Sequence, residues 1–167
     1  LKYGRIDLGW AASYTDKRAK YVHFSDTYRT EVMRLYENTN NQHNVKNLED
    51  IFKQGLTVGA NFGSYYGEEF EQYKTKYKKQ IEYTSATSKR FEMLNKQRID
   101  FAIEDELVGA YFGKKGSNIK LVTNIEHVNK DDIYLMFSKQ TVSVTELAVI
   151  NEYINKNKTA LKALFEH

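Results

Sequence analysis

The chain has 167 residues, 41% of them hydrophobic, which is enough for one domain or two small lobes and excludes a disordered protein. Its 25 basic and 22 acidic residues leave a dispersed net charge near +3, which does not indicate a nucleic-acid-binding surface. The absence of cysteine excludes disulfides and thiolate metal sites. No apolar run reaches the ~18–20 residues that span a bilayer, and the N-terminus lacks the pattern of a signal peptide, so we expect any export signal to have been removed or not included.

The N-terminal part is predicted to contain strands around one short helix. Leu1–Asp7 resembles the end of a helix that leads into a strand through Leu8–Trp10. Thr15 is a suitable N-cap for a helix ending at Ala19. An extended segment at Tyr21–Phe24, a strand at Thr30–Tyr36 and a polar loop at Glu37–Asn44 follow.

Helices and strands then alternate regularly, which favours an α/β fold with a mostly parallel sheet. The predicted helices are Asn47–Lys53, Ser64–Tyr77, Thr87–Lys96 and Asp105–Phe112, and the predicted strands are Leu56–Ala60, Ile81–Thr84, Ile99–Ile103 and Ile119–Leu121. A further strand at Ile133–Phe137 and one or two closing helices over Val144–Glu166 complete the series. The segment Tyr3–Asp7 recurs in part at Lys96–Asp100. Two similar lobes would explain this recurrence, and so would chance.

Five short motifs occur in order across residues 1–113. They are Gly4–Asp7, Ser13–Arg18, Phe24–Tyr28, Asn47–Ile51 together with Val58–Ser64, and Leu94–Asp105. Together they resemble the bacterial extracellular solute-binding proteins of family 3, which bind polar amino acids for ABC importers. Asp16 and Thr27 stand where the family usually has proline, and Gln97 stands where it usually has glycine.

The resemblance implies a periplasmic-binding-protein-like fold of two lobes. Residues 29–131 would form a complete second lobe, whereas residues 1–28 and 132–167 would supply only part of the first. The family's first strand, first helix and second strand have no counterpart here. We therefore expect a remnant of lobe one that is loosely ordered or completed by a second copy in a homodimer.

The implied function is that of a periplasmic or extracytoplasmic receptor without catalytic activity or a cofactor. It would capture an amino acid or similar solute in an interlobe cleft and deliver it to an ABC transporter permease in the membrane. Two alternatives remain: a sensing or regulatory module of a larger membrane protein, and an enzyme similar to cyclohexadienyl dehydratase.

In lobe one the resemblance assigns the ligand carboxylate to Arg18, whose planar guanidinium can form two parallel hydrogen bonds with it. Ser13 and Thr15 would support this contact at the end of a strand and the start of a helix. The alternatives are a solvated Arg18 and a Thr15 that only caps the helix. Trp10 is a candidate wall for the ligand side chain or an ordinary core residue.

In lobe two the matching Asp105 would receive the ligand ammonium group. It can also be the N-cap of the following helix, and Glu104 or Glu106 could take its place. Ser64 matches a residue that contacts the carboxylate, and Gly63 would permit close backbone approach. Asn61 is a further candidate at the end of its strand.

Other chemistries have little support. The histidines, at positions 23, 43, 127 and 167, lack the spacing of a metal or catalytic site. The basic and tyrosine-containing run Lys74–Lys79 is best interpreted as a solvated face. The segment Val58–Gly63 lacks the glycine spacing of nucleotide-binding loops.

Overall fold

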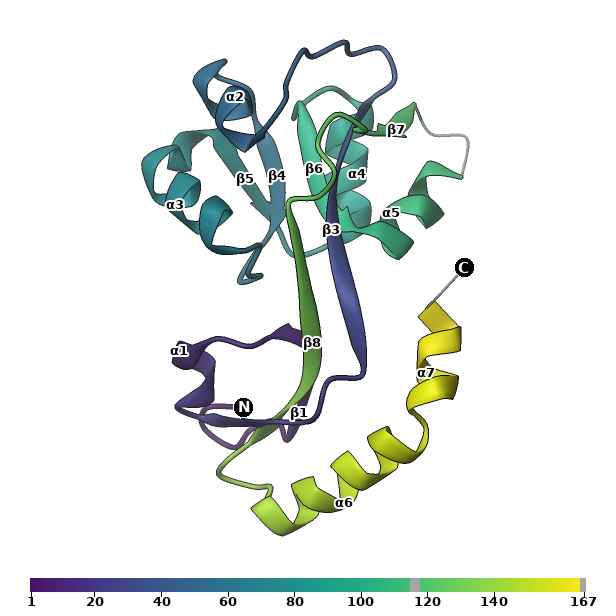
Figure 1. Cartoon of the computed structure of the whole chain (residues 1–167). Helices are drawn as coiled ribbons and strands as arrows, with labels where there is room; N and C mark the ends of the chain where they lie inside the picture. Colours follow the sequence, from purple (N-terminus) through teal and green to yellow (C-terminus); the bar gives the residue numbers. More distant parts are fainter. Residues whose placement is uncertain (115–117, 166–167) are drawn as a thin grey trace. The chain divides into compact units, whose positions relative to one another are not determined.

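The computed structural model describes residues 1–114 and 118–165 (Figure 1). The chain divides into two compact units, one made of Leu1–Glu31 with Asp131–His167 and the other of Val32–Lys130. Two long strands, β3 (Arg29–Asn38) and β8 (Asn129–Ser138), pass from one unit into the other and are neighbours in the strand order. Glu166, the expected end of the closing helices, and His167 lie outside the described residues.

The middle unit has a mixed sheet with a parallel centre. Its parallel strands are β4 (Val58–Asn61), β5 (Ile81–Thr84) and β6 (Phe101–Asp105), with β4 between the other two. On the other side of β6, β3 pairs antiparallel with β6 and with β7 (Ile119–Leu121). The parallel strands place their carboxyl ends at one edge of the sheet, where α/β folds commonly bind ligands.

Helices cover both faces of this sheet (Figure 1). They are α2 (Leu48–Lys53), α3 (Glu68–Lys76), the 3-10 turn η1 (Lys78–Gln80), α4 (Thr87–Asn95) and α5 (Glu106–Gly113). Side chains alternate along β3 and β6, so that Leu35 and Ile103 pack in the core with α2 and α3, while Tyr36 and Ala102 pack with α4. All residues of β6 are buried, and each large apolar side chain there stabilises the fold by about 1.5–3 kcal/mol.

Helix α3 begins at Glu68, so the expected start at Ser64 is wrong. Gly63 and Gly67 have φ of 80° and 87°, which a right-handed helix cannot include. Between them, the buried Tyr66 hydroxyl accepts a hydrogen bond from the Asn61 N–H at 2.7 Å. This contact closes the chain into a turn that precedes the helix.

The terminal unit is built on β8. Strands β1 (Leu8–Ser13) and β2 (Val22–Phe24) both pair antiparallel with it, and α1 (Asp16–Ala19) connects them. The closing helices are α6 (Val144–Lys156) and α7 (Lys158–Phe165), and α6 begins with a capping box of Ser143 and Glu146. Among the described residues, no helix is long and apolar enough to cross a membrane.

A substitution at Gly109 tests the packing of α5 on β3. A Cβ at this position would lie 2.0 Å from Cζ of the Tyr36 ring, so Gly109→Ala should lower the free energy of unfolding by about 1–3 kcal/mol. Gly113→Ala is the matched control, because its Cβ meets nothing within 4 Å and alanine favours the helix by up to about 1 kcal/mol. Urea unfolding measures both variants, and equal stability of the two would contradict this packing.

Candidate functional site

The turn from β1 to α1 holds three of the expected site residues. Ser13 ends the strand and is buried. Thr15 is the N-cap of α1, and its hydroxyl accepts a hydrogen bond from the Arg18 N–H at 3.2 Å. The Arg18 guanidinium donates through Nη1 to the carbonyl oxygen of Ser13 at 2.8 Å. These contacts hold a cationic group against the end of a strand, and we call Trp10, Ser13, Thr15 and Arg18 the terminal half-site.

Trp10 lies at an irregularity in β1. The register with β8 shifts between Gly9 and Ala12, and Ala11 has φ of 52°, as in a β-bulge. The Ala11 N–H donates to the hydroxyl of Tyr28 at 3.1 Å, and burial raises the pKa of that hydroxyl. Trp10 is 74% exposed, which excludes the alternative of a core residue. Tyr28, which sequence reasoning did not select, fixes this bulge.

Asp105 ends β6 and caps α5 in the middle unit. Its Oδ1 accepts hydrogen bonds from the backbone N–H groups of Leu107 at 3.1 Å and Val108 at 3.3 Å. The capping role is therefore present, and the residue is only 3% exposed. The neighbouring acids have different partners: Glu106 pairs with Arg34 at 3.4 Å, and Glu104 pairs with Arg90.

The turn after β4 gathers the remaining candidates. The Asn61 side-chain amide donates to the Ser64 hydroxyl at 2.8 Å, and Gly63 adopts the left-handed conformation between them. Because β4 and β6 are parallel neighbours, this turn and Asp105 lie at the same edge of the sheet. Asn61, Gly63, Ser64 and Asp105 form the middle half-site. Phe62 in the same turn is 75% exposed and was not expected from the sequence.

A buried ion pair lies next to Asp105 and supports the middle half-site. Arg90 on α4 is 1% exposed, contacts the Glu104 carboxylate and donates to the Thr84 hydroxyl at 3.1 Å. Oε1 of Glu104 in turn accepts a hydrogen bond from the backbone N–H of Asp105 at 2.9 Å. This network connects the ends of β5 and β6 to α4. Sequence reasoning missed it, because arginine is normally exposed.

The described part of the chain contains no group of three or more histidine, aspartate or glutamate side chains that could hold a metal ion. The polar groups of the two half-sites are instead one guanidinium, one carboxylate, hydroxyls and an amide. Such groups bind charged organic molecules by hydrogen bonds.

Neither protein-family models nor curated proteins match the sequence. Solved structures match closely in fold. The chain is 20% identical to holo ArgBP from T. maritima, with a TM-score of 0.78 over 95% of this chain and 66% of that one. An ancestral arginine-binding protein bound to glutamine gives 24% identity and a TM-score of 0.77, over 95% of this chain and 68% of that one.

A third similar structure is a histidine kinase sensor domain with similarity to periplasmic binding proteins. It is 18% identical to this chain, with a TM-score of 0.80 over 99% of this chain and 72% of that domain. These likenesses confirm the expected periplasmic-binding-protein-like α/β fold. The chain spans about two thirds of the length of the ArgBP structures, at 66%.

Removing Arg90 tests the support beneath Asp105. Arg90→Met leaves the buried Glu104 charge without its partner and should lower the free energy of unfolding by about 3–5 kcal/mol. Adding Glu104→Gln to this variant removes the stranded charge, so the double variant should recover part of the loss. Arg98→Met, at an exposed position, should stay within about 0.5 kcal/mol of the parent. If urea unfolding gives Arg90→Met and Arg98→Met the same free energy of unfolding, the buried pair does not stabilise the fold.

Proposed function

We propose that this chain is a receptor for a small polar ligand, most simply an amino acid, with its terminal and middle half-sites supplying the polar groups that bind it. The observation that supports this proposal is the chemical complementarity of the half-sites. One offers the Arg18 guanidinium and the other the Asp105 carboxylate, each on a turn that follows a strand. An amino acid carries the two opposite charges.

Arg18 would bind the ligand carboxylate. The guanidinium contacts the Ser13 carbonyl, and its planar fork of donors suits a carboxylate. The hydroxyls of Thr15 and Ser64 would add hydrogen bonds. Trp10, exposed on the bulge beside this turn, would contact the apolar part of the ligand.

Asp105 would bind the ammonium group. Its cap contacts fix the orientation of the carboxylate, and burial removes water that would otherwise compete for it. Closure of two lobes on such a ligand is a common mechanism of receptors with this fold. The proposal extends to location and partner: an extracytoplasmic protein that delivers its ligand to an ABC transporter permease.

A second candidate is a sensing module of a larger membrane protein. The likeness to a histidine kinase sensor domain over 99% of this chain favours it. Both candidates bind a ligand without altering it. The full gene separates them, since a sensor would have a signalling domain on the same polypeptide. Recovery of the incubated amino acid unchanged, measured by mass spectrometry, would count against a dehydratase-like enzyme.

Substitution of Arg18 tests the carboxylate contact. The neighbours bind arginine or glutamine, so these are the first probes for calorimetry and thermal-shift measurements. Loss of a charge-assisted contact costs about 1.5–3 kcal/mol, so Arg18→Ala should lower the affinity for the probe roughly 10- to 150-fold. Lys17→Ala, at the exposed neighbouring position, is the control and should bind as the parent does. Unchanged affinity in Arg18→Ala would exclude this contact.

Asp105 requires two variants because it also caps α5. Asn is as good an N-cap as Asp, so Asp105→Asn should keep the stability within about 0.5 kcal/mol, whereas Asp105→Ala should lose about 0.5–2 kcal/mol. Both variants should lower the affinity for amino acids at least tenfold. The affinity for the corresponding α-hydroxy acids should fall far less, since only an ammonium group needs the countercharge. If Asp105→Asn lowers the affinity for both ligand classes equally, Asp105 acts only as the N-cap of α5.

A further inference from the structure

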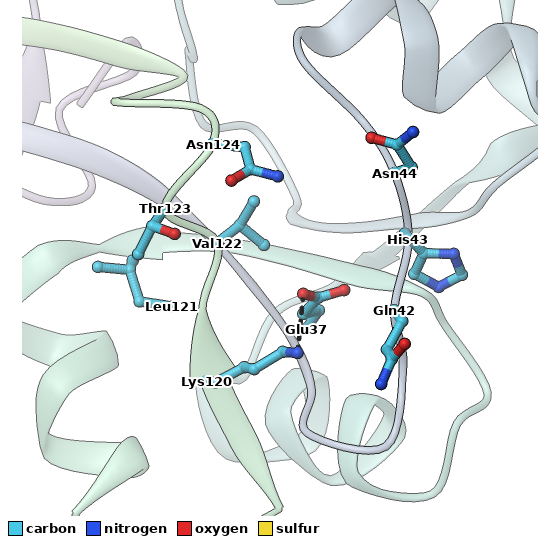
Figure 2. Close-up of a pocket in the computed structure, with 9 residues that line it drawn as sticks. All are labelled: Glu37, Gln42, His43, Asn44, Lys120, Leu121, Val122, Thr123 and Asn124. Carbon is cyan, nitrogen blue, oxygen red and sulfur yellow. Dashed lines mark ion pairs between the residues drawn. The ribbon is translucent and has the colours of Figure 1, made fainter.

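A polar pocket lies in the middle unit. Its volume is about 330 Å³, and Figure 2 shows its lining residues on three segments: the end of β3, the polar loop after it, and the stretch from β7 onward. The lining residues are Glu37, Gln42, His43, Asn44, Lys120, Leu121, Val122, Thr123 and Asn124. We call it the β3–β7 pocket.

The β3–β7 pocket is separate from the middle half-site. In the pairing of β3 with β6, Glu37 is opposite Phe101 at the start of β6, whereas Met33 is opposite Asp105 at its end. The two positions are four residue steps apart along the strand, which is roughly 13 Å. A molecule in this pocket would therefore not be the ligand bound by Asp105.

Glu37 is the unusual residue of this pocket. Its side chain is only 9% exposed, and its Oε1 lies 3.4 Å from the Lys120 ammonium. Its second carboxylate oxygen, Oε2, is buried and has no hydrogen-bond partner among the described residues. A buried acceptor without a donor costs about 1–3 kcal/mol, so a donor supplied by a ligand would be stabilising.

Lys120 provides the opposite charge. Its ammonium has three N–H donors, and besides the contact with Glu37 it donates to the carbonyl oxygen of Asn41 at 3.0 Å. It is 40% exposed, so its remaining donor capacity can reach a bound molecule. Figure 2 shows the Lys120 ammonium directed at Glu37, while the ring of His43 turns away from that carboxylate.

The charges of Glu37 and Lys120 cancel, which disfavours a ligand with a large net charge. Both groups nevertheless retain hydrogen-bonding capacity of opposite kind, one as acceptor and one as donor. Exposed polar side chains, Gln42, Asn44, Thr123 and Asn124, surround them and leave the pocket accessible from solvent. A volume of about 330 Å³ is at the lower end of the range for small-molecule pockets, about 300–1,000 Å³.

We propose that the β3–β7 pocket is a second ligand site, for a small zwitterion such as a short amino acid. The Glu37 carboxylate turns Oε2 toward the pocket to accept a hydrogen bond from the ammonium group of the ligand, and the ligand carboxylate accepts a hydrogen bond from Nζ of Lys120. The site does not depend on the receptor function proposed for Arg18 and Asp105.

Amide chemical shifts of the ¹⁵N-labelled full chain test the site, in the Arg18→Ala background so that the first site is weakened. Glycine is the probe, and ethylammonium and acetate each carry one of its two charges. We expect saturable shifts at residues 41–44 and 119–124 with glycine, and at least tenfold weaker binding of either single-charge probe. Absence of saturable shifts would overturn the proposal and identify a pocket filled only by water.

Two variants locate the binding. Glu37→Gln removes the charge that attracts the ammonium group, and Asn124→Trp obstructs the pocket from an exposed position that the core does not need. Each variant should lower the affinity for glycine at least tenfold. Asn124→Trp keeps the test decisive if Glu37→Gln does not fold. Glycine shifts that persist unchanged in Asn124→Trp would also overturn the proposal.

Discussion

The middle unit depends on the buried pair of Arg90 and Glu104. Two charges removed from water are costly unless each is matched, and here the guanidinium also reaches Thr84 while the carboxylate also reaches the backbone of Asp105. The pair therefore connects three elements and sets the backbone at the edge where Asp105 lies. Gly59 belongs to the same arrangement, because a Cβ there would lie 2.5 Å from Ile99 and 3.1 Å from Arg90.

The two half-sites share one construction. Each takes its charged side chain from a residue near the start of a helix that follows a strand, and each fixes it by contacts with the backbone. Arg18 reaches Ser13 behind it, and Asp105 reaches the N–H groups ahead of it. The residues expected from the resemblance therefore gather on short turns, while the strands beneath them supply the rigidity.

Much of the fold could be predicted from the sequence, because periodic apolar residues mark strands such as Ile81–Thr84 and helices such as Thr87–Asn95. The start of α3 could not, since Gly67 has a positive φ and lies close against Asn129, far along the chain, where a Cβ would be 2.7 Å from Oδ1. For the same reason the burial of Arg90 and Glu37 was invisible: their partners come from other elements. Trp10 is exposed next to a bulge that no local pattern signals.

The contact between Arg18 and the Ser13 carbonyl also bears on conformational entropy. A long side chain that is free in solution loses up to about 2 kcal/mol of rotamer freedom when it is immobilised. Here the fold has already restricted the guanidinium, at 2.8 Å from its acceptor, before any ligand arrives. If Arg18 binds the ligand carboxylate as proposed, the ligand would not have to order this group, so more of the interaction energy would remain as affinity.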